Sequence, residues 1–373
     1  IGLSVFWGIS QATMAVFPSF AKMYLNITDV FMINGVIGAS GIGIAIGAVL
    51  YSRISRHYIE VGTIPLASFG MALTLYLSTI VQSPLLLGIS FLLFGVFGGM
   101  FVVPLNALIQ FNAKKRVLGT ILAGNNWFHS LSMFLMLSMT TVVSYYDFDP
   151  LNTIYLILLI TIIGTLYTVY KLPQSLILLF LKTIVGFKYK LEVNGVKNIP
   201  PSGGVLLLGN HISWIDWAVV LMATPREVRF VMHKPIYEKW YLNWLLKIFK
   251  AIPISTGSSK NTIKTIAKEL DDGNVVVVFP EGAITRNGHL GEFKRGFEKV
   301  LELTTTDVKV IPFYIRGLWE SMFSRASKKF KKSNKTNSVT VSFSRMMRKE
   351  KANIISVKQE LIKLSTKSWQ EHI

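Results

Sequence analysis

The chain has 373 residues, and none of them is cysteine. Disulfide bonds, thiolate metal sites and a cysteine nucleophile are therefore excluded, and we predict no metal site. Acidic residues are also scarce, since 20 Asp and Glu oppose 39 Lys and Arg and leave a formal net charge of +19. Ordinary soluble domains do not combine such a charge with 51% hydrophobic residues and a mean hydropathy of +0.46.

Charged residues are few in the first 170 positions. This stretch holds six Lys or Arg and four Asp or Glu, whereas the remainder holds 33 basic and 16 acidic residues. Such segregation predicts two domains that face different solvents. The chain also begins at Ile1 without an initiator Met, in an apolar stretch that lacks the charged start and cleavage site of a signal peptide. We therefore expect a fragment whose true start lies upstream.

Six apolar stretches in the first domain are long enough to cross a membrane. A bilayer core of roughly 30 Å requires about 20 helical residues. No Lys, Arg, Asp or Glu lies near the centre of any stretch, which separates membrane spans from long buried helices. The predicted spans cover residues 1–21, 30–52, 61–81, 84–110, 117–143 and 151–170.

The loops between these stretches alternate in charge. Arg53, Arg56, the basic run 114–116 and the basic second domain fall on one side, whereas Asp147 and Asp149 fall on the other. Basic residues stay on the cytoplasmic side of a membrane. The alternation therefore predicts a multi-pass protein of the inner membrane whose second domain is cytoplasmic.

Small and polar residues mark particular faces of the predicted spans. Gly35, Ala39, Gly43 and Gly47 recur every four residues and would let a neighbouring helix approach closely. Polar side chains at membrane depth predict either a substrate path or hydrogen bonds between helices. These polar side chains belong to Asn34, Asn106, Asn125, Asn126 and His129.

Two stretches of the first domain carry a family resemblance, residues 47–56 (GAVLYSRISR) and residues 97–108 (FGGMFVVPLNAL). They resemble the C-terminal six-helix half of a major facilitator transporter, of the lysophospholipid-transporter type that is found fused to acyltransferases. The first stretch departs from the family signature, because Ser52 and Ile54 lack its Asp and Gly character. Such transporters have twelve spans, so the resemblance implies that six spans alone do not transport.

The second domain alternates strand and helix signals, as α/β domains do. Short, β-branched apolar runs predict buried strands at residues 205–210, 275–280 and 308–315. A helix is expected from Lys260 to Leu270, and a later strand at 338–343.

Three further segments combine apolar residues with lysines. Residues 173–187 are apolar but too short to span a membrane, and they predict either an interfacial helix or a core helix. In the segment 237–250, Trp240, Trp244 and Ile248 share a helical face that would rest on anionic lipid or pack in the core. Residues 353–373 predict a basic amphipathic helix.

His211 follows the first predicted strand, and Asp216 lies five residues later. A regular helix would point these side chains about 140° apart, so a contact requires a turn before the helix begins. The sequence from Ser213 to Asp216 has the form of a capping box and supplies that turn, although capping alone would also explain Asp216. A neutral imidazole held by a carboxylate can take the proton from an attacking alcohol.

A second group of polar residues follows the strand predicted at 275–280. Gly282, after Glu281, permits an unusual backbone angle or a close ligand approach, and Arg286 can hold a phosphate with two hydrogen bonds. Lys294 and Arg295 add two cations nearby. Each residue alone is also typical of a turn or a solvated surface. Their order and spacing after the histidine favour acyl transfer to a phosphate-bearing alcohol.

Across about residues 190–345 these motifs resemble the glycerolipid acyltransferases, of the 1-acylglycerol-phosphate acyltransferase type. The resemblance implies that His211 is the general base and Asp216 its partner. A further motif of the family, a strand that ends in proline, matches residues 310–312. The residues that the resemblance assigns to the acceptor and its phosphate, together with the neighbouring cations, are Asn210, Glu281, Gly282, Arg286, Lys294 and Arg295.

The second motif of that family is altered. Many members have an arginine for phosphate where Ser255 and Thr256 follow residues 251–254 (AIPI), so only Lys250 or Lys260 could substitute. The departure, together with residues 229–245 and 323–330, resembles a narrower group, the 2-acylglycerophosphoethanolamine acyltransferases that are also acyl-carrier-protein synthetases. A phosphodiester headgroup carries less charge than a phosphomonoester, so fewer cations would suffice.

These observations predict a membrane α-helical bundle of six spans, half of a major facilitator fold, at residues 1–170. An interfacial linker at 171–190 would lead to a cytoplasmic α/β acyltransferase domain at 191–373. The predicted reaction transfers a fatty acyl group from acyl carrier protein (acyl-ACP) or acyl-CoA to a lysophospholipid hydroxyl, preferably that of lysophosphatidylethanolamine.

Two alternatives to this reaction stay open. One is a 1-acylglycerol-3-phosphate acyltransferase, and the other is a lysophospholipid transporter module with a non-catalytic membrane-binding domain. The expected partners are membrane phospholipid, the lysophospholipid acceptor and acyl carrier protein, and no motif predicts nucleic-acid binding. We expect no bound cofactor, and neither ATP nor Mg²⁺, because the chain ends before any adenylating domain.

Overall fold

A computed structural model describes all residues except 56–57, 256–258, 328–336 and 371–373. The chain divides into two compact units, Ile1–Leu179 and Phe180–Ile373, and the boundary lies within the predicted linker. Arg56 of the predicted basic loop, Thr256 and part of the segment 323–330 lie outside the described residues.

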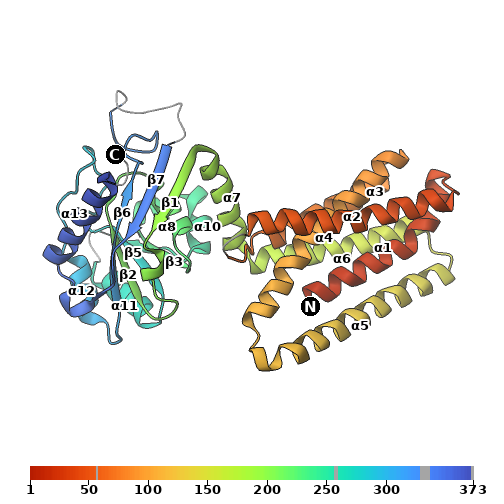
Figure 1. Cartoon of the computed structure of the whole chain (residues 1–373), viewed down its shortest axis with the longest axis horizontal. Coiled ribbons are helices and arrows are strands. Elements are labelled where there is room, and N and C mark those ends of the chain that lie inside the picture. Colours follow the sequence, from red (N-terminus) through yellow and green to blue (C-terminus); the bar gives the residue numbers. More distant parts are fainter. Residues whose placement is uncertain (56–57, 256–258, 328–336, 371–373) are drawn as a thin grey trace. The chain divides into compact units, whose positions relative to one another are not determined.

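The first unit consists of long helices whose bounds agree with the six predicted spans to within a few residues (Figure 1). Five candidate spans, Val30–Ile54, Thr63–Ile80, Pro84–Asn112, Lys115–Tyr145 and Pro150–Lys171, are long and apolar enough to cross a membrane. The remaining helix is less apolar and buries Ser4, Ser10 and Thr13. The six helices are α1 Gly2–Leu25, α2 Val30–Ile54, α3 Thr63–Ile80, α4 Pro84–Asn112, α5 Leu118–Tyr145 and α6 Pro150–Lys171.

The predicted ridge of small residues brings α2 against α4. A Cβ atom at Gly43 would overlap the Leu92 carbonyl of α4, and a Cβ at Gly95 would overlap the Ser40 carbonyl of α2. Only glycine permits this close approach of two backbones. Gly35 does not take part, because a Cβ there would meet nothing within 4 Å.

The second unit is built on an eight-stranded mixed sheet, which confirms the predicted α/β fold class (Figure 1). The strand order is β1-β7-β6-β2-β5-β3-β4, and β8 pairs with β6. The strands are β1 Tyr189–Asn194, β2 Val205–Gly209, β3 Val228–His233, β4 Ile252–Ile254, β5 Val275–Val278, β6 Lys309–Arg316, β7 Asn337–Phe343 and β8 Met347–Arg348. The helices are the end of α7 Pro173–Lys188, then α8 Asp216–Ala223, α9 Lys234–Tyr237, α10 Trp240–Ile248, α11 Ser259–Asp271, α12 Gly296–Leu303 and α13 Ile354–Gln370.

Four neighbouring strands of this sheet are parallel. Leu208 of β2 lies between Val278 of β5 and Pro312 of β6, and β5 also pairs in parallel with β3. The predicted apolar runs fill the core, where the side chains from Val205 to Leu208 and from Val275 to Val277 have no exposed surface. The carboxyl ends of β2, β3, β5 and β6 therefore meet at one edge of the sheet, and the loops that carry the predicted motifs begin there.

Two predicted helices differ in detail from those observed. The segment 237–250 is not one helix. The short helix α9 ends at Tyr237, and α10 begins at Trp240. Trp240 and Trp244 are 86% and 56% exposed, so packing in the core does not explain them. The closing helix, α13, is described to Gln370, and its residues Val357 and Leu361 are fully buried.

Candidate active site

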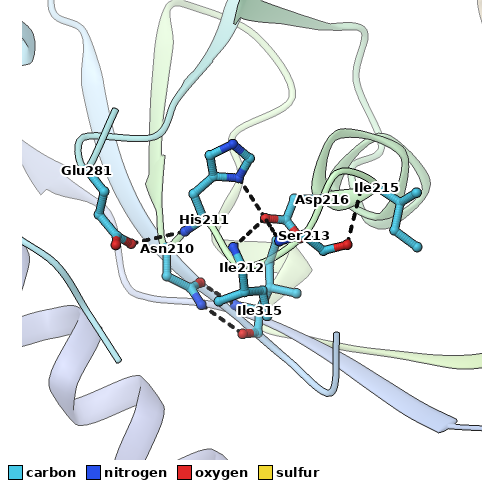
Figure 2. Close-up of polar contacts among 8 residues, drawn as sticks. All are labelled: Asn210, His211, Ile212, Ser213, Ile215, Asp216, Glu281 and Ile315. Carbon is cyan, nitrogen blue, oxygen red and sulfur yellow. Dashed lines mark hydrogen bonds and ion pairs between the residues drawn. The ribbon is translucent and has the colours of Figure 1, made fainter. Parts of the chain in front are cut away.

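The loop between β2 and α8 brings His211 and Asp216 together (Figure 2). The Nδ1 atom of His211 lies 2.8 Å from Oδ2 of Asp216. The same oxygen accepts hydrogen bonds from the backbone amides of Ile212 at 2.7 Å and Ser213 at 3.0 Å. The chain thus turns before the helix begins, as the five-residue spacing requires for a contact. With Nδ1 as the donor to the carboxylate, Nε2 is the nitrogen that can accept a proton.

Asp216 is completely enclosed, whereas the His211 side chain is 23% exposed. Burial raises the pKa of the Asp216 carboxyl above its ordinary value, because a carboxylate loses its hydration. The hydrogen bond from His211 and the amides of Ser213 and Ile212 act in the opposite direction, since they stabilise the charged form. A buried carboxylate with several donors is well suited to hold the imidazole in one orientation and tautomer.

The capping interpretation of Asp216 is also partly correct. Its carboxylate accepts from the Ser213 amide, which is one half of a capping box. The second half is altered, because Ser213 Oγ accepts from the Ile215 amide at 3.3 Å and α8 begins at Asp216 itself. One carboxylate therefore fixes both the turn and the histidine ring.

Phe279 packs against one face of the His211 imidazole. Its ring stacks on the imidazole of His211 with 4.3 Å between centroids and 14° between planes. Phe313 then meets Phe279 edge-on at 6.1 Å. Phe279 belongs to the apolar run 275–280, but the sequence did not predict this contact, because strand alternation does not show which loop side chain a ring will cover.

Glu281 contacts the backbone of the loop between β2 and α8 (Figure 2). Its Oε1 atom accepts from the His211 amide at 3.0 Å, and its Oε2 accepts from the Gly291 amide at 3.0 Å. Burial raises the pKa of Glu281, and the two amide hydrogen bonds oppose that effect. Both oxygens are thus engaged with the chain itself, so Glu281 ties the loop after β5 to the loop after β2.

Asn210, which was predicted to bind substrate, has its side chain turned into the sheet. The side chain is 2% exposed, donates through Nδ2 to the Ile315 carbonyl at 2.9 Å, and accepts through Oδ1 from the Ile315 amide at 2.7 Å (Figure 2). Ile315 lies on β6, 105 residues further along the chain. Asn210 therefore joins the end of β2 to β6 and has no exposed polar face for a substrate.

The predicted cations occupy different positions. Lys294 lies over Gly282, where a Cβ atom would be 2.8 Å from its Nζ, and the left-handed backbone of Gly282 (φ +70) also favours glycine. Arg295 points elsewhere, with its Nε 3.5 Å from Glu298 and its side chain 80% exposed. Arg286 is exposed, and its carbonyl accepts from the Trp319 indole at 3.3 Å. Lys294 is thus the predicted cation that lies at the Pro-Glu-Gly turn, which is formed by residues 280–282.

Among the described residues, no hydrogen bond or ion pair joins Lys250 or Lys260, the two substitutes proposed for the missing second-motif arginine, to the loop between β2 and α8. Lys250 has a positive φ of 50 and lies 3.8 Å from Glu227. Lys260 is an exposed residue in the first turn of α11. Over the described ranges, no group of three or more His, Asp or Glu side chains could hold a metal ion.

The predicted polar residues of the helical unit differ in their exposure. Asn34 and Asn126 are exposed, Asn106 and Asn125 are half-buried, and His129 is buried. The Nε2 atom of His129 has no hydrogen-bond partner among the described residues. Within the part of the chain that the structure covers, no hydrogen bond joins one of these five side chains to another, and their role in a substrate path stays a prediction.

Comparison with known proteins matches each unit to a different family. Residues 190–316 match the family model described as acyltransferase. Over 138 residues the chain is 27% identical to a chloroplastic 1-acyl-sn-glycerol-3-phosphate acyltransferase of Arabidopsis thaliana, covering 36% of this chain and 38% of that enzyme. The N-terminal part is similar to the lysophospholipid transporter LplT of Cronobacter sakazakii, with 32% identity over 146 residues, 37% of this chain and 35% of the transporter.

The chain thus spans less than half the length of each of these two relatives. A crystal structure of the acyltransferase PlsC from Thermotoga maritima also matches, with a TM-score of 0.42 and 17% identity over 50% of this chain and 77% of that one. The family matches confirm the predicted combination. The chain joins an N-terminal part similar to lysophospholipid transporters to an acyltransferase-family domain at residues 190–316.

Proposed function

We propose that the second unit transfers a fatty acyl group from an acyl thioester to the hydroxyl of a lysophospholipid. The observation that carries this proposal is the 2.8 Å contact between His211 and the enclosed Asp216, at the sheet edge where the Pro-Glu-Gly turn also lies. The arrangement provides a base with a fixed tautomer and needs no metal or bound cofactor. Acyl-ACP and acyl-CoA both supply the thioester that this chemistry requires.

In the proposed reaction, Nε2 of His211 takes the proton of the acceptor hydroxyl as its oxygen attacks the thioester carbonyl. Asp216 stabilises the imidazolium that forms. The tetrahedral intermediate then breaks its carbon–sulfur bond, and the leaving thiolate takes the proton back from His211. The products are a diacyl phospholipid and a free thiol, and the enzyme carries no covalent intermediate.

The acceptor phosphate would lie near Lys294 and Arg286. The Lys294 ammonium lies against Gly282, one residue after Glu281, which contacts the His211 amide. A cation at this turn would hold the acceptor headgroup while the acceptor hydroxyl faces the imidazole. We favour lysophosphatidylethanolamine, because its phosphodiester requires fewer cations than the phosphomonoester of lysophosphatidic acid.

The proposed location is the cytoplasmic face of an inner membrane. Its support is the alternation of loop charges along the candidate spans, from Arg53 to Asp147 and Asp149. The similarity of the N-terminal part to lysophospholipid transporters supports lysophospholipid as the substrate class of the neighbouring domain. Transport by the helical unit itself is a separate proposal, since the chain covers 35% of that relative.

The catalytic role is tested with the full chain in nanodiscs, a labelled acyl thioester and lysophosphatidylethanolamine. We expect His211→Ala to lower acyl transfer by about 10²–10⁴-fold, the usual contribution of a general base. His233→Ala is the matched control, because His233 is an exposed histidine of the same domain. A folded His211→Ala variant with undiminished transfer would contradict this mechanism, whereas no transfer by the wild-type chain would favour the alternative, a non-catalytic membrane-binding domain.

A specific observation keeps lysophosphatidic acid as the second candidate acceptor. The Arabidopsis relative is named for that substrate, 1-acyl-sn-glycerol-3-phosphate. Competition between the two lysophospholipids in one reaction separates the candidates, because the ratio of products gives the ratio of kcat/KM. A preference for lysophosphatidic acid would overturn our choice of acceptor and leave the catalytic mechanism intact.

A further inference from the structure

An exposed apolar surface lies beside the catalytic loop. The side chains of Trp214, Met322 and Phe323 are 49%, 53% and 42% exposed. The Trp214 amide donates to the Phe323 carbonyl at 2.9 Å, and an isolated β-bridge at the adjacent residues joins the same two loops. These contacts hold the loop that carries Met322 and Phe323 against the loop that carries Trp214, and His211 lies three residues before Trp214 on the second loop.

Two cations lie on the aromatic rings of this surface. The Arg325 guanidinium is 5.5 Å from the centroid of the Trp214 ring. The Lys188 ammonium is 5.9 Å from the centroid of the Phe323 ring and 3.5 Å from the sulfur of Met322. Neither cation forms an ion pair with a carboxylate of the described residues, so their charge is available to an anion outside the protein.

We propose that Trp214, Met322, Phe323, Lys188 and Arg325 form a lipid-facing surface that seats this domain on an anionic bilayer. Aromatic and apolar side chains that alternate with cations match the boundary between acyl chains and headgroups. Anionic lipid attracts basic residues near its surface. The inference deepens the proposed acyl transfer and rests on it, because it names the place from which the acceptor reaches His211.

A bilayer fits this surface better than an acidic protein does. The chain carries five candidate membrane spans, so its second unit is covalently attached to a protein segment suited to a membrane. Tethering gives the domain a high effective concentration at the lipid surface, and modest apolar area then suffices for contact. An acidic carrier protein would match the two cations but leaves no reason for three adjacent exposed apolar side chains.

The absence of cysteine permits a direct test with the full chain. Spin labels are attached to single-cysteine variants, Met322→Cys and Phe323→Cys, in nanodiscs that contain anionic phospholipid. Ile355→Cys is the matched control, because Ile355 is a 70% exposed apolar residue on α13. We expect oxygen collisions to exceed collisions with a water-soluble nickel complex at the first two positions only. Labels at all three positions that are equally accessible to nickel would overturn the proposal.

Charge reversal tests the cationic part of the surface. Lys188→Glu together with Arg325→Glu should move the labels at positions 322 and 323 toward water, whereas Lys351→Glu should not. Protection of the same labels by acyl carrier protein, without any protection by the bilayer, would instead identify a protein-docking site. The depth of the labels is measured in the absence of any acyl-transfer reaction. The result therefore does not depend on the His211→Ala comparison, and either proposal can fail without the other.

Discussion

His211 in the acyltransferase domain is partly exposed and His129 on α5 is buried, and their ring nitrogens are placed differently. His211 is paired with Asp216 at 2.8 Å, whereas Nε2 of His129 has no partner among the described residues. The sheet explains the difference, because parallel strands end at one edge and their loops come together there. A helix instead distributes its polar side chains around separate faces, so a similar depth in α2, α4 and α5 does not by itself bring such side chains together.

The largest expected effect separates these two histidines. Asp216→Asn keeps the size of the side chain but removes the charge that stabilises the imidazolium, and we expect kcat to fall by about 10³–10⁴-fold. His129→Gln should leave acyl transfer unchanged. Both variants are assayed in nanodiscs with the same thioester and acceptor. An equal loss in the His129→Gln variant would show that the two units work as one catalytic system.

The next effect concerns stability and tests whether Asn210 has a structural role. Asn210→Ala leaves the buried amide and carbonyl of Ile315 without partners, and we expect a loss of about 2–4 kcal/mol in the free energy of unfolding. Thermal unfolding in detergent measures this loss, with the exposed Asn261→Ala as control. If Asn210 instead binds the acceptor, the variant would raise KM and leave the unfolding transition in place.

A smaller effect distinguishes two adjacent cations. Lys294→Ala should raise the KM for the acceptor by about tenfold, because it removes the ammonium held at Gly282. Arg295→Ala should change KM by less than about twofold, because its exposed pair with Glu298 contributes little. The two KM values are measured over a series of acceptor concentrations. Equal effects of the two substitutions would show that the phosphate lies outside the Pro-Glu-Gly turn.

The smallest effect depends on pH. Burial raises the pKa of Glu281 from its ordinary 4.5, so the folded state binds a proton at this carboxyl more tightly than the unfolded state does. The resulting stabilisation is complete below the unfolded pKa and is lost as pH rises through the folded pKa. Glu281→Gln removes this dependence. We therefore expect the wild-type Tm to fall relative to that of the variant as pH rises from 4.5, and parallel Tm curves would contradict this account.

The sequence predicted the elements that hydrophobic runs define. The six helices and the strands β2, β5, β6 and β7 lie where apolar stretches placed them, because such runs must be buried or face lipid. The turn between His211 and Asp216 was also predictable from its spacing. These features depend only on residues that are close together in the chain.

Contacts between distant residues were not predictable in the same way. Asn210 pairs with Ile315, 105 residues later, and Glu281 contacts the His211 amide across 70 residues. Both partners are backbone groups, which every residue carries, so no sequence pattern marks them. The direction of Lys294 and Arg295 likewise depends on the start of α12, where Glu298 attracts only the second cation.

A single-turnover transfer of a labelled acyl chain tests the central claim most directly. The full chain in nanodiscs is mixed with less than one equivalent of labelled acyl thioester and an excess of lysophosphatidylethanolamine, and the label is followed in protein and lipid. We predict that the label passes directly to diacyl phospholipid, with none on the protein, and that His211→Ala slows this step by at least about 10²-fold. A labelled protein intermediate, or an undiminished rate in the variant, would contradict direct transfer by His211.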